Sequence, residues 1–413
     1  MKRTALALAL SCAWGVATNA GAQSTDEKLR ILQQEIDELK AEVQNAPRGS
    51  AAQPASGAAR QQGSATTISG YGEFNYNNYR GDEHPTQADL RRFVLGFHHR
   101  WDERLTFHSE VELEHAVVSN VDEGEVEIEQ AWVNYKFSDA VNVKGGLFLI
   151  PLGILNETHE PTTYYGVERN EVETRIIPTT WRELGVGVHG LLGTSGFRYD
   201  VGITTGFDTG KLDEPLTGVR SAHQEGQLAH AYDLSIYGAL NYRTRGLLVG
   251  GGVYTGNTGQ NGATSPLLKG VSARLTMWEV HAQYRVGGLD LQALYVDGKL
   301  GDADQINASI LATQPQPFAA PQSMKGAYVQ AAYHVYKSGK LDLAPFVRLE
   351  GIDIRQQEDP ANGLFQDPAN HERIVTAGFN FWVHPQVVLK ADVQRFRTDT
   401  TLDRFDLGLG YMF

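Results

Sequence analysis

The stretch "RFDLGLGYMF", residues 404–413, decides the fold. Every second residue is apolar, and the residues between them up to position 410 are polar or glycine; the alternating apolar ones are Phe405, Leu407, Leu409, Tyr411 and Phe413. Neighbouring side chains of a β-strand point to opposite faces, so this strand has one apolar face and one that is not. We expect the apolar face to contact lipid and residues 404, 406, 408 and 410 to face a water-filled lumen.

The same alternation recurs from residue 68 onward and predicts sixteen strands. Most exceed ten residues, whereas a typical strand has five or six. Strands of this length cross a bilayer when they are tilted. The expected strands are 67–79, 88–100, 104–116, 126–137, 141–150, 182–192, 196–207, 231–243, 246–256, 271–286, 289–299, 324–336, 341–354, 372–383, 386–397 and 402–413.

The connections between these strands alternate in length. Every second one is a tight turn, and most of the others are long, notably 151–181, 208–230, 300–323 and 356–371. Outer-membrane barrels have short periplasmic turns and long outer loops. Only a closed barrel leaves no sheet edge in hydrocarbon, and sixteen strands enclose an aqueous lumen. The predicted fold is an all-β, 16-stranded antiparallel transmembrane β-barrel over residues 67–413. Strand 402–413 closes it against strand 67–79, and its terminal aromatic residue lies at the periplasmic rim.

Residues 1–22 are predicted to form a secretory signal peptide. Met1-Lys2-Arg3 is basic, residues 5–16 are apolar, and Ala20-Gly21-Ala22 is an A-x-A cleavage site. Its removal takes away Cys12, the single cysteine, and changes the formal net charge from −13 to −15. So acidic a chain lacks the basic face that binds nucleic acid. No later stretch is apolar enough for a membrane-spanning helix.

Residues 23–45 are predicted to form a periplasmic coiled coil. Apolar residues follow a 3–4 spacing there: Leu29, Leu32, Ile36, Leu39 and Val43. The stretch is too short to be stable as a lone helix, so an oligomerising coil is favoured over an amphipathic helix that packs on a core. Residues 46–66, rich in Ala, Gly, Gln, Ser and Pro, form a flexible linker. The expected partners are outer-membrane lipids, lipopolysaccharide and the barrel assembly machinery.

An enzymatic barrel is the alternative that fits least. The sequence has no G-x-S-x-G and no H-E-x-x-H motif, and we expect no catalytic residue, cofactor or metal site. The pair His98-His99 cannot chelate one ion, because adjacent residues of a strand face opposite ways.

The segment "GLFLIPLGILNETHE" resembles a motif of the phosphate-selective porin O/P family, G-x-F-x-x-P-x-G. Its matching residues are Gly146, Phe148, Pro151 and Gly153. The resemblance implies a homotrimer of 16-stranded channels for small hydrophilic solutes, in which the third outer loop, here 151–181, folds inward as a constriction. It also implies that the solutes are anions, phosphate among them. Leu149 stands where the family commonly has lysine, so organic acids such as dicarboxylates, or weak general selectivity, remain alternatives.

The expected constriction is built from basic side chains. One wall comprises His159, Arg169, Arg175 and Arg182, and the facing wall comprises Arg348 and Lys390. The alternative is that the loop arginines pair with loop glutamates and only hold the loop in place; these are Glu157, Glu160, Glu168, Glu171 and Glu173.

Acidic residues on two strands also face the lumen or its rim. Glu110, Glu112 and Glu114 share one phase and predict a ladder of carboxylates inside the lumen. Glu127 and Glu129 share the phase of outward-facing residues, so either a β-bulge intervenes or they stand above the bilayer.

Overall fold

The structure is a computed structural model that describes residues 65–122 and 124–413. The expected signal peptide, coiled coil (Leu29, Leu32, Ile36, Leu39 and Val43) and nearly all of the linker lie outside the described residues. The first strand segments are β1 (Ala65–Tyr79), β2 (Gln87–Arg100), β3 (Leu105–Glu114), β4 (Val126–Lys136), β5 (Asn142–Leu149), β6 (Arg182–Leu191), β7 (Phe197–Thr204), β8 (Ser235–Thr244) and β9 (Leu247–Gly256). The others are β10 (Leu275–Val286), β11 (Leu289–Leu300), β12 (Pro321–Tyr333), β13 (Tyr336–Ser338), β14 (Leu341–Gln356), β15 (His371–His384), β16 (Val387–Phe396) and β17 (Arg404–Met412).

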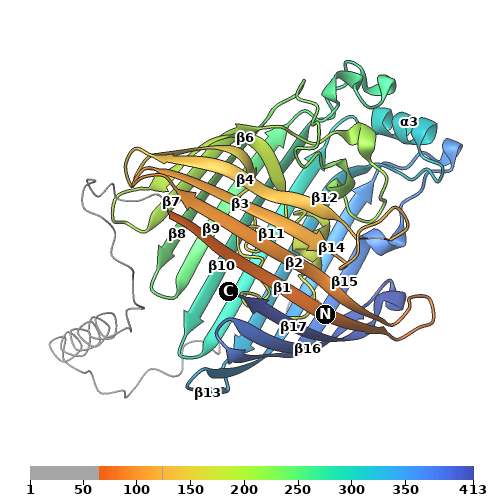
Figure 1. Ribbon diagram of the computed structural model, residues 1–413. Coiled ribbons are helices and arrows are strands. Elements are labelled where there is room, and N and C mark those ends of the chain that lie inside the picture. Colours follow the sequence, from red (N-terminus) through yellow and green to blue (C-terminus); the bar gives the residue numbers. More distant parts are fainter. Residues whose placement is uncertain (1–64, 123) are drawn as a thin grey trace, which may run out of the picture. The chain divides into compact units, whose positions relative to one another are not determined.

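These strands form one closed antiparallel barrel (Figure 1). Each pairs with its neighbour in the chain, and β17 pairs with β1. At the end of that seam Gly70 and Phe413 exchange main-chain hydrogen bonds of 3.0 and 2.8 Å. The short β13 continues β12, since both pair with β14. The seventeen segments therefore make the expected sixteen strands, and the first and last of them close the barrel as predicted.

The alternation in residues 404–413 separates the two faces of β17. Phe405 and Leu407 are each 43% exposed on the outer face, whereas Arg404 and Asp406 are buried on the inner one. Burying apolar side chains inward is the rule for soluble proteins, and the reversed pattern here is that of a barrel whose outside contacts lipid.

A β-bulge in β4 resolves the phase of its two glutamates. Glu110 pairs with Gln130 while Val111 pairs with Ile128, which leaves Glu129 as the extra residue. The outward alternation of β4 therefore changes register there, and Glu129 is fully buried on the lumen side. Of the two predicted alternatives, the bulge is the observed one.

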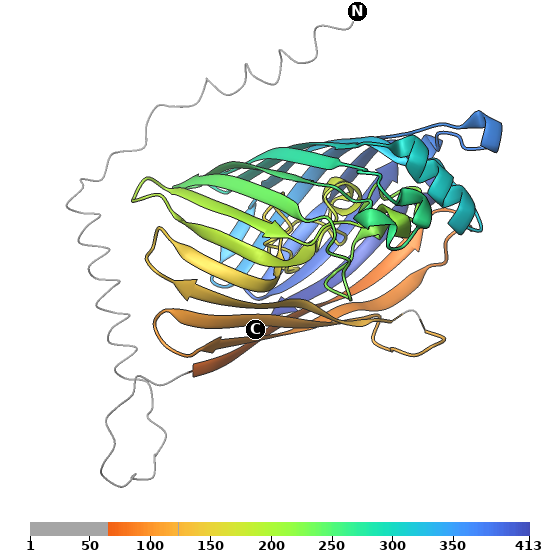
Figure 2. The same cartoon turned by 90° about the horizontal axis from the view of Figure 1, so that it is seen from above.

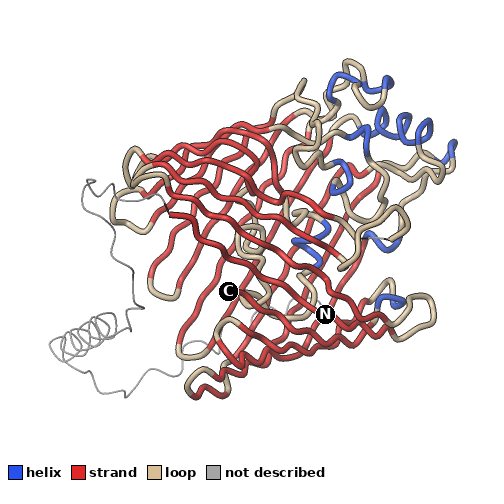
Figure 3. The backbone as a smooth tube through the Cα atoms, viewed as in Figure 1, coloured by secondary structure: helices blue, strands red, loops and turns tan. Residues whose placement is uncertain are grey.

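The long connections and the tight turns lie at opposite ends of the strands (Figure 3). The connections carry two α-helices, α2 (Glu171–Arg175) and α3 (Ala303–Thr313). They also carry 3₁₀ turns: η2 (Thr209–Lys211), η3 (Arg220–Ala222), η4 (Gln260–Gly262), η5 (Pro266–Leu268), η6 (Pro360–Asn362), η7 (Pro368–Asn370) and η8 (Thr400–Leu402). No helix in the described part of the chain is long and apolar enough to span a bilayer.

An apolar core fills part of the barrel's interior. It forms where loop 151–181 packs against the inner face of the wall, and its largest fully buried side chains include Phe148, Trp181, Phe207 and Tyr254. Because the core joins the loop to several strands, the loop is a packed part of the fold.

Candidate pore constriction

Loop 151–181 enters the barrel and crosses to the far wall. It lies within the ring of strands in two perpendicular views (Figures 1 and 2). Its middle is held by β15 and β16, where the Gly166 and Val167 N–H groups donate to Asn380 and Asp392 at 3.3 and 2.7 Å. The Tyr164 hydroxyl donates to Glu73 on β1 at 2.8 Å. The expected inward fold of this loop is thus observed.

Two lumen-facing glycines of β17 leave room for the loop. A Cβ on Gly410 would lie 2.5 Å from Cβ of Pro161, and a Cβ on Gly408 would lie 3.1 Å from Val167. Both positions face inward as expected, but they contact the loop rather than open water.

Glu173 organises the inner end of the loop. Its side chain is fully buried and accepts hydrogen bonds from the N–H groups of Ile154 and Leu155, at 2.7 and 2.8 Å. It also accepts from Asn170 and Tyr328, at 3.1 and 2.7 Å. Burial raises the pKa of Glu173, while these donors lower it in part. Asn170 also accepts from the N–H of Glu173 and so caps α2.

His159 meets a carboxylate of the wall. Nε2 of its buried imidazole lies 3.1 Å from Oε1 of Glu129 on β4. Burial alone would lower the pKa of His159, but the Glu129 carboxylate outweighs it and the pKa lies above its ordinary value. The side chain thus lies at a contact between the loop and β4.

A cavity of about 780 Å³ lies beside the loop and is lined by charged side chains. Arg169 lies at its edge, and its Nε and Nη2 atoms are buried without a hydrogen-bond partner among the described residues. Arg220 also lines the cavity and donates to the carbonyls of Thr174 and Thr179, at 3.3 and 2.7 Å. Burial and the neighbouring Arg169 lower the pKa of Arg220. Two guanidinium groups therefore approach one cavity.

Most carboxylates of the cavity already have a cationic partner. Arg92 on β2 binds Glu73, Glu112 and Glu114 at 2.7, 2.9 and 3.5 Å. Arg182 binds Glu127 and lies 3.3 Å from Glu225. Two members of the predicted ladder on β3, Glu112 and Glu114, thus share one arginine of the neighbouring strand. The remaining member, Glu110, accepts a hydrogen bond of 2.6 Å from Gln130.

Three other predicted constriction residues do not line the cavity. Arg348 is buried, donating to Glu350 at 2.7 Å and to the carbonyl of Tyr165 at 3.0 Å. Lys390 places Nζ 3.5 Å from the ring centroid of Tyr164. Arg175 donates to the carbonyls of Leu216 and Ala369, at 2.9 and 3.2 Å. The structure therefore brings Arg169 and Arg182 to the cavity, while Arg175, Arg348 and Lys390, like His159, make contacts that hold the loop in place.

The alternative prediction was that the loop arginines pair with the loop glutamates. Among the described residues they form no such ion pair. Within residues 65–122 and 124–413, the loop glutamates form their arginine ion pairs with strand residues. Arg198 lies 3.9 Å from Glu157, and Arg404 lies 3.9 Å from Glu171.

The site residues predicted from the sequence do not include Arg91, Arg92 and Arg220, which line the cavity. The inward direction of Arg92 could have been predicted, because Arg92 alternates with the outward residues Phe93 and Phe97 of β2. Arg220 lies in loop 205–234, where no periodicity could have placed it.

The barrel and its folded-in loop define a class of protein, the outer-membrane channels called porins. Solved porins share the fold. OmpF of Salmonella typhi, in complex with daunomycin, matches with a TM-score of 0.57 and 11% identity, over 86% of this chain and 99% of that one. An anion-selective porin from Comamonas acidovorans matches with a TM-score of 0.54 and 12% identity, over 85% and 100% of the two chains.

The family model described as "Phosphate-selective porin O and P" matches residues 67–399. An uncharacterized protein of Aquifex aeolicus (strain VF5) is 29% identical over 373 residues, which cover 87% of this chain and 83% of that protein. The chain belongs to the phosphate-selective porin O and P family. Family and fold indicate a channel of the outer membrane rather than an enzyme.

Proposed function

We propose that this protein is a passive channel for small hydrophilic solutes that prefers anions, phosphate among them. One observation carries the proposal: Arg169 and Arg220 line the cavity with no ion pair among the described residues, whereas five of the carboxylates there are paired with Arg92 or Arg182. Charges that face confined water select the ions that pass. The description of the family also supports an anionic solute.

The chemical class of the anion follows from the guanidinium group. Its planar fork binds phosphate and carboxylate oxygens in the same two-point geometry. Small organic acids, including dicarboxylates, therefore remain the second candidate solutes. We further propose that three copies assemble as a homotrimer, which the family resemblance supports, with the predicted coil at residues 23–45 as an aid to assembly.

Bilayer recordings test the proposed selectivity. Under a potassium chloride gradient, the wild-type reversal potential should favour chloride. The double variant Arg169→Gln with Arg220→Gln should shift it towards potassium, while Arg355→Gln, which removes an arginine that is 69% exposed on its side chain, should not. A wild-type channel that favours potassium would refute the anion preference. Block of the chloride current by phosphate, compared with block by succinate, ranks the two solute classes.

A further inference from the structure

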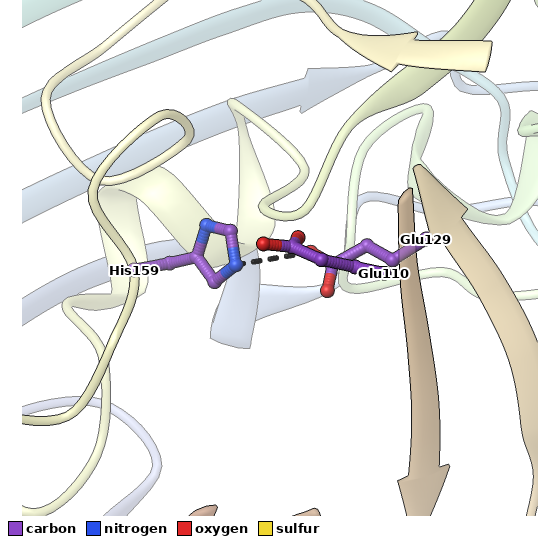
Figure 4. A group of neighbouring side chains, drawn as sticks. All are labelled: Glu110, Glu129 and His159. Atoms are coloured by element: carbon purple, nitrogen blue, oxygen red, sulfur yellow. Dashed lines mark ion pairs between the residues drawn. The ribbon is translucent and has the colours of Figure 1, made fainter. Parts of the chain in front are cut away.

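We infer that Glu110, Glu129 and His159 bind a divalent metal ion such as Zn²⁺, which fastens loop 151–181 to the barrel wall. One donor atom from each side chain lies within 4.8 Å of the other two. The ligands come from three separate elements, β3, β4 and the loop, and converge on one point (Figure 4). Two carboxylates and one imidazole are a donor set that zinc accepts, with water at the fourth position.

The hydrogen bond at the far side of the imidazole fixes how His159 faces the carboxylates. Nδ1 of His159 lies 3.1 Å from the carbonyl oxygen of Asn156, which can only accept. Nδ1 therefore carries a hydrogen, and in the neutral ring Nε2 presents its lone pair to Glu129. Metal-binding histidines are commonly oriented in this way by a carbonyl behind the ring.

Nε2 of His159 and Oε1 of Glu129 are left facing each other. They lie 3.1 Å apart, both are buried, and neither makes a hydrogen bond within the described residues. Two acceptors at this distance need a cation or a proton between them. Ligands about 2.0–2.2 Å from a tetrahedral ion lie about 3.4 Å apart, so this pair nearly has the spacing already.

The second carboxylate favours a metal ion over a proton. The two carboxylates approach each other in a confined space, and one imidazolium proton neutralises only one negative charge. A hydrogen bond from another residue also orients each carboxylate: Tyr71 donates to Oε2 of Glu129 at 3.3 Å, and Gln130 donates to Oε2 of Glu110 at 2.6 Å. A dication would satisfy both carboxylates and the imidazole at once.

The sequence carries no metal-binding motif for this site. Its ligands are separated by 19 and 30 positions, and the bulge at Glu129 is what turns that side chain inward. The site therefore exists only once the loop has folded into the barrel.

Titration with Zn²⁺ alone tests the inference on the full chain without a histidine tag. Calorimetry should find one saturable ion per chain, and Co²⁺ should give the visible absorption of a low-symmetry site. His159→Gln should weaken Zn²⁺ binding by more than about 100-fold, since loss of an outer-shell partner alone costs 10–100-fold. His108→Gln is the matched control, because it removes another lumen histidine that contacts His98 rather than the cluster.

Three outcomes would overturn the inference. They are no Zn²⁺ binding by the wild type, equal binding by wild type and His159→Gln, or loss of binding in His108→Gln alone. Should His159→Gln fail to fold, Glu110→Gln provides the same test, because the amide can keep a hydrogen bond to Gln130. Retention of full Zn²⁺ affinity by folded Glu110→Gln would then contradict the site.

Discussion

The hydroxyl of Tyr328 on β12 donates a 2.7 Å hydrogen bond to the carboxylate of Glu173 in α2. This bond joins the wall of the barrel to the loop that narrows it. Since the same carboxylate holds two main-chain N–H groups of the loop, the position of the constriction depends on one buried side chain.

Replacing Glu173 should widen the pore without unfolding the barrel. Glu173→Ala leaves buried donors unpaired at a cost of about 1–3 kcal/mol each, whereas Tyr328→Phe removes one bond worth about 1 kcal/mol. The barrel keeps its strand pairing in both. We expect a larger and noisier single-channel conductance for Glu173→Ala and a small change for Tyr328→Phe. Equal conductance in all three proteins would show that Glu173 does not hold the loop.

Replacing Arg92 should make the channel more permeable to cations. Arg92→Gln leaves Glu73, Glu112 and Glu114 without their shared partner, so uncompensated carboxylates face the cavity. Breaking such a buried pair costs about 3–5 kcal/mol, and thermal stability should fall as well. The measurement is the reversal potential in a salt gradient. Arg198→Gln, which removes a half-exposed arginine 3.9 Å from its glutamate, is the control and should leave the potential unchanged.

Acid should loosen the loop through Glu168. Its carboxylate accepts from Asn75 and Asn77 at 3.0 and 3.1 Å. Burial raises its pKa, but Arg91 and Arg404 outweigh burial, and the pKa lies below its ordinary value of 4.5. A lowered pKa means that the folded state favours the charged form. The stabilisation is therefore present above pH 4.5 and is lost as the pH falls through the lowered value.

Conductance recorded between pH 7 and pH 3 measures this loss. The wild type should become noisier as the pH falls, and Glu168→Gln should lack that component because its side chain does not titrate. An identical pH response in both proteins would assign the acid effect to other groups.

A methyl group on β17 should displace the loop. Gly410→Ala places a Cβ 2.5 Å from the ring of Pro161, and overpacking of this kind costs about 1–3 kcal/mol. The matched control is Gly351→Ala on β14, where a Cβ meets no atom within 4 Å. We expect altered conductance in the first variant and wild-type conductance in the second, with heat-resistant barrels in both. If Gly410→Ala has wild-type conductance, the loop adjusts to the added methyl group without a change in the pore.

Strand positions could be predicted because alternation is a local signal. The expected 289–299 is observed as Leu289–Leu300, and 126–137 as Val126–Lys136. Differences arise where loops impose their own hydrogen bonds. The expected strand 271–286 begins at Leu275, because the N–H groups of Thr258 and Gly259 bond to the carbonyl of Ser272 and hold that segment in the loop.

The sequence predicts which way the charged side chains of the lumen point, but not which residues surround them. Alternation correctly turns Arg348 and Lys390 inward, yet it carries no information about what lies over them. The carbonyl of Tyr165 and the ring of Tyr164 cover these two side chains. Arg220 comes to the cavity from a different loop, and only the packing of the two loops places it beside Arg169.

The anchors of the constriction also set the order in which the pore matures. Loop 151–181 follows β5, but Thr162 contacts Met412 and Gly166 contacts Asn380, which lie 250 and 214 residues further along the chain. Contacts of such sequence separation form late, since the intervening chain must first be organised. We therefore expect the constriction to be complete only once β15, β16 and β17 are in place, because its anchors lie on those strands.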